Sequence, residues 1–491
     1  MSRLIKKISF LVIVFFCLIP YQYGNAEETA QILDAQIIIS DGSDPTVIRD
    51  QSFTSKLNLT GNTEIEIHSS VEIGAIYLIW DTPTPGWSFI SNGKTSVHGE
   101  NGFLHEYVPL EQASTSITLR IPESGAILCD LIVLSPGTPP ANIQVWEPPC
   151  QKADLLLLST HADDEHLFFG GTMPYYAGEK GFRVQLVYFC SHAANEPYRE
   201  HEKLNGLWLT GVRNYPIMGD FPDEYSTSLE TALTQYNYDE AVAFVTTQLR
   251  RFQPLVVLGQ DLNGEYGHGA HQLTAKALTD AIQLSNRSDY HPDSIKQYGL
   301  WDVPKTYLHL YPENRIQMNW NIPLERFGGQ TALQMADAGY KTHASQQWCW
   351  FYVSDSYEYS CAEFGLFRSL VGPDSIGGDF MENITPYDQQ ASEKKKPTNT
   401  STDTEIPENT KHNTISSTPP KQTQQPKITT DTPNSKEEAT IPSSSKISSQ
   451  NNQDLLSIFS KHFSQHFFTI LIVLVLLTII VIIITISKRH K

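Results

Sequence analysis

Two apolar runs, each followed at once by a cluster of His, Asp and Glu residues, constrain this chain most. The first run, residues 154–160, leads into His161-Ala162-Asp163-Asp164-Glu165. The second, residues 255–258, leads into a turn that ends in His268-Gly269-Ala270-His271. An uninterrupted apolar strand is typical of a parallel sheet covered on both faces. Ligands collect at the carboxyl edge of such sheets, so both clusters are predicted to belong to one site.

Strand and helix signals alternate after Pro148-Pro149. The apolar periodicity predicts strands at 154–160, 183–190, 254–260 and 306–311, and helices at 198–209, 239–251, 271–284 and 331–347. This alternation predicts a doubly wound α/β domain over residues 151–387.

The preceding segment, residues 27–150, has a different pattern. Short runs of β-branched and aromatic residues recur between turn signals at 35–40, 63–68, 75–80, 103–110, 116–121, 126–134 and 142–146. Many short strands at this spacing predict an all-β, sandwich-like domain. Such folds often bind carbohydrate, which is an analogy of fold alone, and packing against the next domain is an equally good interpretation.

The two ends of the chain have the composition of targeting segments. Residues 1–26 combine a basic start, an apolar run and a small-residue end, which predicts a signal peptide cleaved after Ala26; a first membrane helix is the alternative. Residues 388–460 are rich in Ser, Thr, Pro and Lys, which predicts a disordered stalk. Residues 467–486 are predicted to form a transmembrane helix, with 487–491 as a basic cytoplasmic tail. We therefore expect a single-pass cell-membrane protein with an extracellular body.

Charge and cysteine content narrow the possible partners. The chain has 54 Asp and Glu against 35 Lys and Arg, a net charge of −19, which argues against nucleic acid as a partner. Cys17 leaves with the signal peptide, so five cysteines remain and at least one has no intramolecular partner. Two pairings stay open, Cys349 with Cys361 and Cys129 with Cys150.

The residue types in the two clusters suit metal-assisted hydrolysis. One imidazole and one carboxylate of the first cluster can hold a divalent metal while the second carboxylate remains free as a base. His268 and His271 follow the second strand at a spacing that lets both point into the same site. The alternatives are that Asp163 or Asp164 only caps a helix, and that the histidines lie on the surface.

These motifs resemble those of the PIG-L/LmbE-like metal-dependent N-deacetylases. HADDE at 161–165 is similar to the family's AHPDDE, and NGEYGHGAH at 263–271 is similar to its GHPDH. Residues 198–202, 209–212 and 342–346 look like the family's Arg-x-x-Glu helix, Leu-Gly-Val turn and late His-x-Ser-Gln segment. The resemblance covers residues 151–350. It implies a Rossmann-like fold and hydrolysis of an N-acetyl group, commonly on a glucosamine-containing substrate.

The resemblance also implies roles for individual residues. It implies a zinc ion, with Fe²⁺ suited to the same His2Asp set. The residues are His161, Asp164 and His271 as metal ligands, Asp163 as general base, His268 as the group that stabilises the oxyanion or protonates the leaving amine, Tyr266 near the substrate carbonyl, and Arg199 as a substrate contact. For Arg199, a solvated helix face is the alternative.

Two positions depart from the family pattern. Ala162 replaces a proline, which is expected only to loosen the turn. Ala270 replaces an aspartate, whose loss is expected to lower the rate or shift the pH optimum. We therefore expect a cell-surface metal-dependent hydrolase that removes N-acetyl groups from an N-acetylglucosamine-type sugar or glycoconjugate. The alternatives are an amidase for another small N-acyl compound, and a surface carbohydrate-binding protein whose deacetylase domain has decayed.

Overall fold

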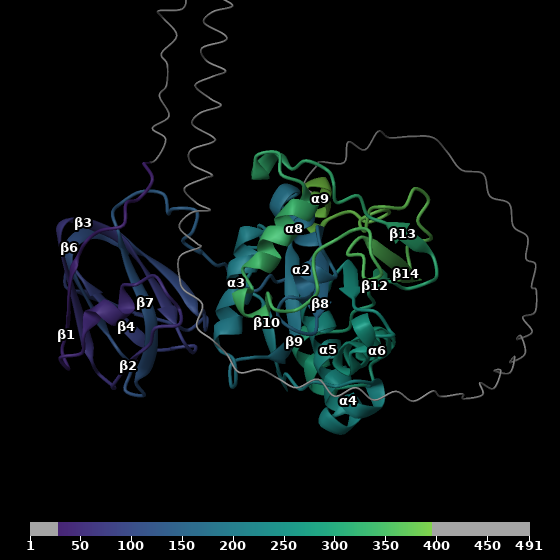
Figure 1. Cartoon of the computed structure of the whole chain (residues 1–491), viewed down its shortest axis with the longest axis horizontal. Coiled ribbons are helices and arrows are strands. Elements are labelled where there is room, and N and C mark those ends of the chain that lie inside the picture. The colour runs from purple at the N-terminus through teal and green to yellow at the C-terminus, as the bar shows by residue number, and fades with distance from the viewer. Residues whose placement is uncertain (1–27, 395–491) are drawn as a thin grey trace, which may run out of the picture. The chain divides into compact units, whose positions relative to one another are not determined.

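The computed structural model describes residues 28–394 (Figure 1). The predicted signal peptide, transmembrane helix and cytoplasmic tail lie outside the described residues, as does the predicted stalk beyond residue 394. The first residues of that stalk belong to helix α9 (Tyr387–Lys394), so ordered structure extends past the predicted boundary at 387. Within 28–394, no helix has both the length and the apolar character needed to cross a bilayer.

The N-terminal part is all-β, as predicted. Its strands form one sheet in the order β2-β7-β3-β6-β4-β5, with β1 paired to β3. The strands are β1 (Gln36–Ile39), β2 (Leu57–Leu59), β3 (Glu64–Trp80), β4 (Trp87–Ser91), β5 (Lys94–His98), β6 (His105–Arg120) and β7 (Ala126–Leu134), and the 3-10 helix η1 (Pro45–Ile48) follows β1.

Two long strands give this domain its sandwich-like form. The four strands predicted at 63–68, 75–80, 103–110 and 116–121 merge into β3 and β6. The pairing of β3 with β6 shifts register between His68 and Ala75, which is where an irregularity lets a strand bend. The first part of β3 pairs with β1 and the last part with β7, so apolar side chains from both parts enclose one core.

The second sheet has the order β10-β9-β8-β11-β12-β14-β13. Five strands pair in parallel, and β14 pairs antiparallel with both β12 and β13, so the sheet is mixed at one edge. The strands are β8 (Leu155–Ser159), β9 (Val184–Ser191), β10 (Ile217–Pro222), β11 (Val256–Gly259), β12 (Lys305–His309), β13 (Arg315–Gln317) and β14 (Glu363–Ser369). The strand order reverses between β8 and β11, and this switch point is where open α/β sheets bind ligands.

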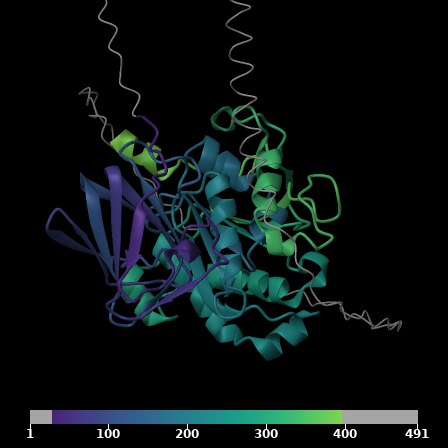
Figure 2. The same cartoon turned by 60° about the vertical axis from the view of Figure 1, so that its left-hand side comes forward.

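Helices cover both faces of this sheet, which confirms the doubly wound α/β prediction (Figure 1, Figure 2). Alternate residues of β8 face the two cores, with Leu155 and Leu157 in one and Leu156 and Leu158 in the other. One face holds α2 (Asp164–Leu167), the π-helical segment η2 (Met173–Glu179), α3 (Tyr198–Leu209) and α8 (Ala332–Lys341). The other holds α4 (Leu229–Gln235), α5 (Tyr238–Phe252), α6 (Gly269–Leu284) and α7 (Pro292–Tyr298). Three 3-10 turns complete the domain: η3 (Glu265–Gly267), η4 (Glu325–Phe327) and η5 (Ala344–Gln346).

Two predicted elements are wrong. The helix expected at 331–347 ends at Lys341, and a separate turn, η5, follows it. The strand expected at 142–146 does not form, because this segment instead packs against the α/β domain. The Trp146 ring lies 5.5 Å from the rings of both Trp208 and Tyr215, and Gln144 bonds Asn205.

The five cysteines of the described region, Cys129, Cys150, Cys190, Cys349 and Cys361, are all free thiols. Neither of the two pairings that the sequence left open is present. Cys150 instead contacts the Gln185 side chain, while Cys361 is buried against Gly170.

Candidate active site

Each of the five parallel strands delivers a polar side chain to the same edge of the sheet. The residues that follow or end β8, β9, β10, β11 and β12 are, in that order, His161, His192, Asp223, Gln260 and His309. The carboxyl ends of parallel strands share one edge, so residues far apart in the sequence are brought together there.

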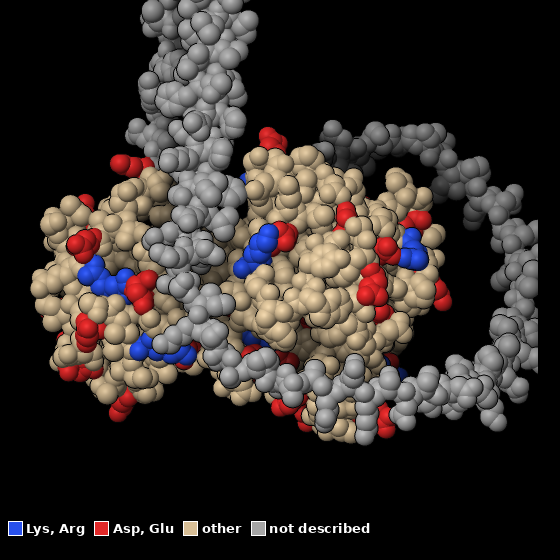
Figure 3. All heavy atoms as spheres, in the orientation of Figure 1, with Lys and Arg blue, Asp and Glu red and all other residues tan. Residues whose placement is uncertain are grey.

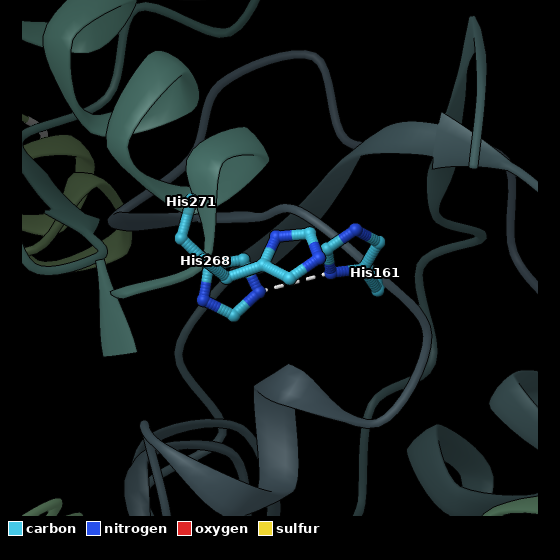
Figure 4. Close-up of side chains that lie close together, drawn as sticks. All are labelled: His161, His268 and His271. Carbon is cyan, nitrogen blue, oxygen red and sulfur yellow. Dashed lines mark hydrogen bonds between the residues drawn. The ribbon is translucent and has the colours of Figure 1, made fainter. Parts of the chain in front are cut away.

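Three side chains form a tight triangle at the switch point. The distance from His161 Nδ1 to His271 Nε2 is 2.9 Å, and Asp164 Oδ2 lies 3.2 Å from each of these nitrogens. Figure 4 shows the His161 and His271 rings joined by this contact, with His268 beside them. All three corners of the triangle are buried.

Glu265 fixes the orientation of His271. Its Oε2 lies 2.8 Å from His271 Nδ1, and its Oε1 lies 2.7 Å from His309 Nδ1. Burial opposes ionisation of Glu265, but these hydrogen bonds hold its pKa at about 2. The ionised carboxylate accepts from Nδ1–H of His271, so the lone pair of the neutral ring is on Nε2, which points into the triangle.

The triangle suits a divalent cation. Metal–ligand bonds of about 2.0–2.2 Å in a tetrahedral site place the ligand atoms about 3.3 Å apart, close to the observed spacing. Burial lowers the pKa of His271, yet the Asp164 and Glu265 carboxylates raise it to about 9. Burial also opposes ionisation of Asp164, but His271 and His161 hold its pKa well below the usual range. Positive charge is therefore favoured here.

Asp163 lies beside the triangle in a strained conformation. Its φ of 111° is rare for a residue with a side chain, and such strain costs about 1–3 kcal/mol. A hydrogen bond of 2.8 Å from its backbone N–H to Glu165 Oε2 helps to hold this conformation. Its carboxylate makes no capping bond to α2, so the helix-cap alternative is wrong for Asp163. Burial and the neighbouring Asp164 carboxylate raise the pKa of Asp163 to about 7.

His268 and Tyr266 face the triangle from the turn after β11. The His268 ring centroid is 4.9 Å from that of His161 and 4.8 Å from that of His271. Burial, followed by His161 and His271, lowers the pKa of His268 to about 3, so this ring is neutral. Tyr266 has a φ of 48°, and its ring lies 5.4 Å from His271. Gly264 makes the turn possible, because a Cβ there would meet the His268 carbonyl oxygen at 2.5 Å.

Arg199 is buried on α3, so the solvated-face alternative is wrong for it. Its Nη2 donates to the Ala162 carbonyl at 2.8 Å and lies 3.7 Å from Asp163 Oδ1. Its Nη1 donates to Asp223 Oδ2 at 3.0 Å. In this structure the guanidinium therefore holds the turn that carries Asp163, and a contact with substrate remains a prediction.

Three residues that surround the triangle have no role predicted from the sequence: Glu265, His309 and Asp223. Glu265 lies within the quoted motif, whereas His309 and Asp223 end or follow strands at the same sheet edge. Asp223 Oδ1 lies 3.4 Å from His161 Nε2. The signal that finds His309 and Asp223 is their place at the carboxyl end of a parallel strand. It was missed for Asp223 because β10 was not predicted, whereas the strand that ends at His309 was predicted but no local motif linked it to the site.

Fold and site together define the class: an α/β protein with a His2Asp cluster and a free aspartate at the switch point of its sheet. Residues 156–282 form a domain of the family described as PIG-L: GlcNAc-PI de-N-acetylase, so the resemblance inferred from the motifs is confirmed. The chain is 29% identical over 185 residues to a 1D-myo-inositol 2-acetamido-2-deoxy-alpha-D-glucopyranoside deacetylase from Streptomyces scabiei (strain 87.22), covering 32% of this chain and 56% of the relative. It is 27% identical over 202 residues to a 1D-myo-inositol 2-acetamido-2-deoxy-alpha-D-glucopyranoside deacetylase 1 from Catenulispora acidiphila, covering 36% and 59%.

These curated relatives are matched over little more than half of their length. Among solved structures, the chain is similar to an N,N'-diacetylchitobiose deacetylase from Pyrococcus horikoshii, with 19% identity and a TM-score of 0.30. That match covers 40% of this chain and 72% of the other.

Proposed function

We propose that this protein is a metal-dependent hydrolase that removes the acetyl group from an N-acetylglucosamine-type sugar or glycoconjugate. The observation that carries the proposal is the position of Asp163, a buried carboxylate outside the triangle but next to it. A site with three converging donor atoms and one adjacent uncommitted base has the parts that hydrolysis of an amide needs. The family of residues 156–282 supports the choice of an N-acetyl sugar.

His161, Asp164 and His271 would hold the ion, with zinc as the proposed metal. When bound, such an ion lowers the pKa of water and polarises the acetyl carbonyl. Glu265 keeps the lone pair of His271 directed at the ion, and Gln260 donates to Asp164 Oδ2 at 3.1 Å and thus orients that carboxylate.

Asp163 is the proposed general base. Its pKa of about 7 leaves much of it ionised near neutral pH and lets it release a proton again after accepting one. It takes a proton from the attacking water and then transfers it to the departing amine. Two contacts keep the Asp163 carboxylate in place. Arg199 Nη2 lies 3.7 Å from Asp163 Oδ1, and the backbone N–H of Asp163 donates to Glu165.

His268 and Tyr266 are the proposed groups at the acetyl oxygen. A neutral His268 can donate an N–H hydrogen bond to an oxygen that gains negative charge. Its Nδ1 has no hydrogen-bond partner, and the buried Ala270, where many family members carry an aspartate, offers none. His268 therefore acts here without the carboxylate partner expected in the family.

The test is the substitution Asp163→Asn. The amide has nearly the same shape but cannot accept a proton, so turnover is expected to fall about 10²–10⁴-fold while metal content is unchanged. Acetate release and metal content are measured together, with N-acetylglucosamine conjugates and simple N-acyl amines as substrates. Near-parental activity would contradict the assignment of the base, and preference for the simple amines would favour the amidase alternative.

We also propose that the body is exported and anchored by its C-terminus, on the basis of the sequence of residues 1–26 and 467–486 alone. Protease added to intact cells is then expected to release a folded body by cutting between 395 and 460. A body that stays protected until the cells are lysed would contradict this location.

A further inference from the structure

A continuous series of aromatic rings crosses the candidate active site. The Tyr225 ring lies 5.3 Å from His268. The Tyr266 ring lies 5.6 Å from His268 and 4.5 Å from Phe351. The series continues from Phe351 to Trp350 at 4.2 Å. We call Tyr225, Tyr266, Phe351 and Trp350 the aromatic strip.

Both ends of the strip are open to solvent. Tyr225 is 72% exposed and Trp350 is 60% exposed, whereas most large apolar side chains of the chain are buried. The neighbouring Trp348 is 81% exposed. Contiguous exposed apolar surface on a soluble domain marks a binding site more often than chance placement. Here the two exposed ends are connected through the rings of His268, Tyr266 and Phe351.

The segment that carries Trp350 is held in place. The Phe351 ring packs against Tyr266 and also lies 6.3 Å from Phe168, which is fully buried. The segment closes on itself through a bond from Cys361 N–H to the Ser354 carbonyl. It lies after residue 282, where the match to the family model ends.

The chemistry of the strip favours a glycan as its occupant. Pyranose rings present C–H faces that pack on aromatic side chains, and their hydroxyls stay solvated at an open site. A nucleic acid or an anionic lipid surface is disfavoured by the net charge of −19. On the face shown in Figure 3, Lys and Arg side chains lie scattered among Asp and Glu without forming a continuous basic patch.

We propose that the aromatic strip binds the sugar rings that neighbour the one that is deacetylated, so that the substrate is an uncharged N-acetylated glycan of at least three sugar units. This inference rests on the proposed function and deepens it. One unit lies at the His161–Asp164–His271 triangle, one neighbouring unit packs on Tyr225, and others pack on Phe351 and Trp350.

The test uses the full chain loaded with metal, and measures acetate release from N-acetylglucosamine and from its β-1,4- and β-1,6-linked oligomers of two to five units. We expect kcat/KM to rise with length in one series up to at least three units. Trp350→Ala should lower kcat/KM for the pentamer about tenfold more than for the monomer, through KM, because the Trp350 ring contacts Phe351 and Tyr359 and not the triangle. Trp350→Phe should retain most of the effect of length.

Ile376→Ala is the matched control, because Ile376 is 93% exposed and lies outside the strip. Equal kcat/KM at every length, with Trp350→Ala behaving like Ile376→Ala, would overturn the inference and leave the proposed function standing. Loss of binding to uncharged lipid vesicles in Trp350→Ala, without any effect of length, would overturn it in favour of a membrane surface. No acetate from any member of either series would instead contradict the proposed function.

Discussion

The pair His161–His271 and the pair His105–His201 both place two ring nitrogens 2.9 Å apart inside the protein. Their surroundings differ. Asp164 lies 3.2 Å from both rings of the first pair, and Glu265 bonds the far nitrogen of His271. The second pair joins the β domain to α3. Tyr77 Oη bonds His105, and the Phe53 ring stacks on His201. Asp81 and Cys129 each have an atom within 4.8 Å of a His201 ring nitrogen.

This difference reverses the proton affinity of the two pairs. Carboxylates overcome the effect of burial in the first pair and raise the pKa of His271 to about 9. In the second pair burial dominates and lowers the pKa of His201 to about 4. Two close histidines are therefore not a cation site by themselves. The ionised groups around them decide whether the pair attracts a cation or serves as a neutral link between domains.

The largest expected effect comes from deleting one member of each pair. His271→Ala removes one of three donors, so bound metal and acetate release are both expected to fall to background. His201→Ala is the matched control and should keep the metal of the triangle, because it removes none of the three donors. Metal analysis of the two purified variants decides the matter. Full occupancy in His271→Ala would mean that the ligand set is misassigned, and the same comparison applies to His161→Ala and Asp164→Ala.

A smaller effect is expected from Glu265→Gln, which keeps the shape of the side chain but removes its charge. Partners that orient a ligating histidine typically contribute about 10–100-fold to metal affinity. Titration of the metal-free protein with zinc measures this change, with Glu64→Gln as the control, since Glu64 lies in the β domain and pairs with Arg120. An affinity equal to that of the parent would show that the carboxylates do not distinguish the two pairs.

The smallest effect concerns pH and the neutral pair. The pKa of His201 is lower in the folded protein than its ordinary value of 6.5, so its contribution to stability is present above pH 6.5 and is lost as the pH falls toward 4. Between pH 6.5 and pH 5 this corresponds to about 2 kcal/mol. Urea unfolding at pH 6.5 and at pH 5 measures this contribution. The free energy of unfolding should fall less between these two pH values in metal-free His201→Gln than in the metal-free parent. The pH dependence of stability has the opposite sign for His271. Its raised pKa contributes stability that is lost as the pH rises through about 9.

Local sequence patterns predicted the elements that local patterns determine. Helix α3 has the predicted bounds, and β7 likewise, because each has a clear periodicity and defined ends. The short strands β4 and β5 were not predicted, since they are half-exposed and exist only through their pairing with each other and with β6. The bend that joins two predicted strands into β3 depends in the same way on partners distant in the sequence.

The residues of the candidate site likewise fall into those that local patterns predict and those that depend on partners distant in the sequence. The motifs predicted the residues that converge on the triangle, because these residues directly follow two apolar strands. The motifs gave no role to His309, although it bonds Glu265, because 44 residues separate the two and no local signal links them. The loop that carries Trp350 was also missed, since its closeness to Tyr266 arises from the packing of Phe351.

The buried contacts between the β domain and the α/β domain bear on how this protein can be divided. Leu104 N–H donates to Tyr215 Oη at 3.0 Å, and the Phe103 ring stacks on Tyr215 at 4.5 Å. A fragment that starts at residue 151 would expose His201, Trp208 and Tyr215 to water and lose these contacts. The β domain is thus part of the support of the helix that carries Arg199, and grafting the α/β domain alone onto another protein would require redesign of that face of α3.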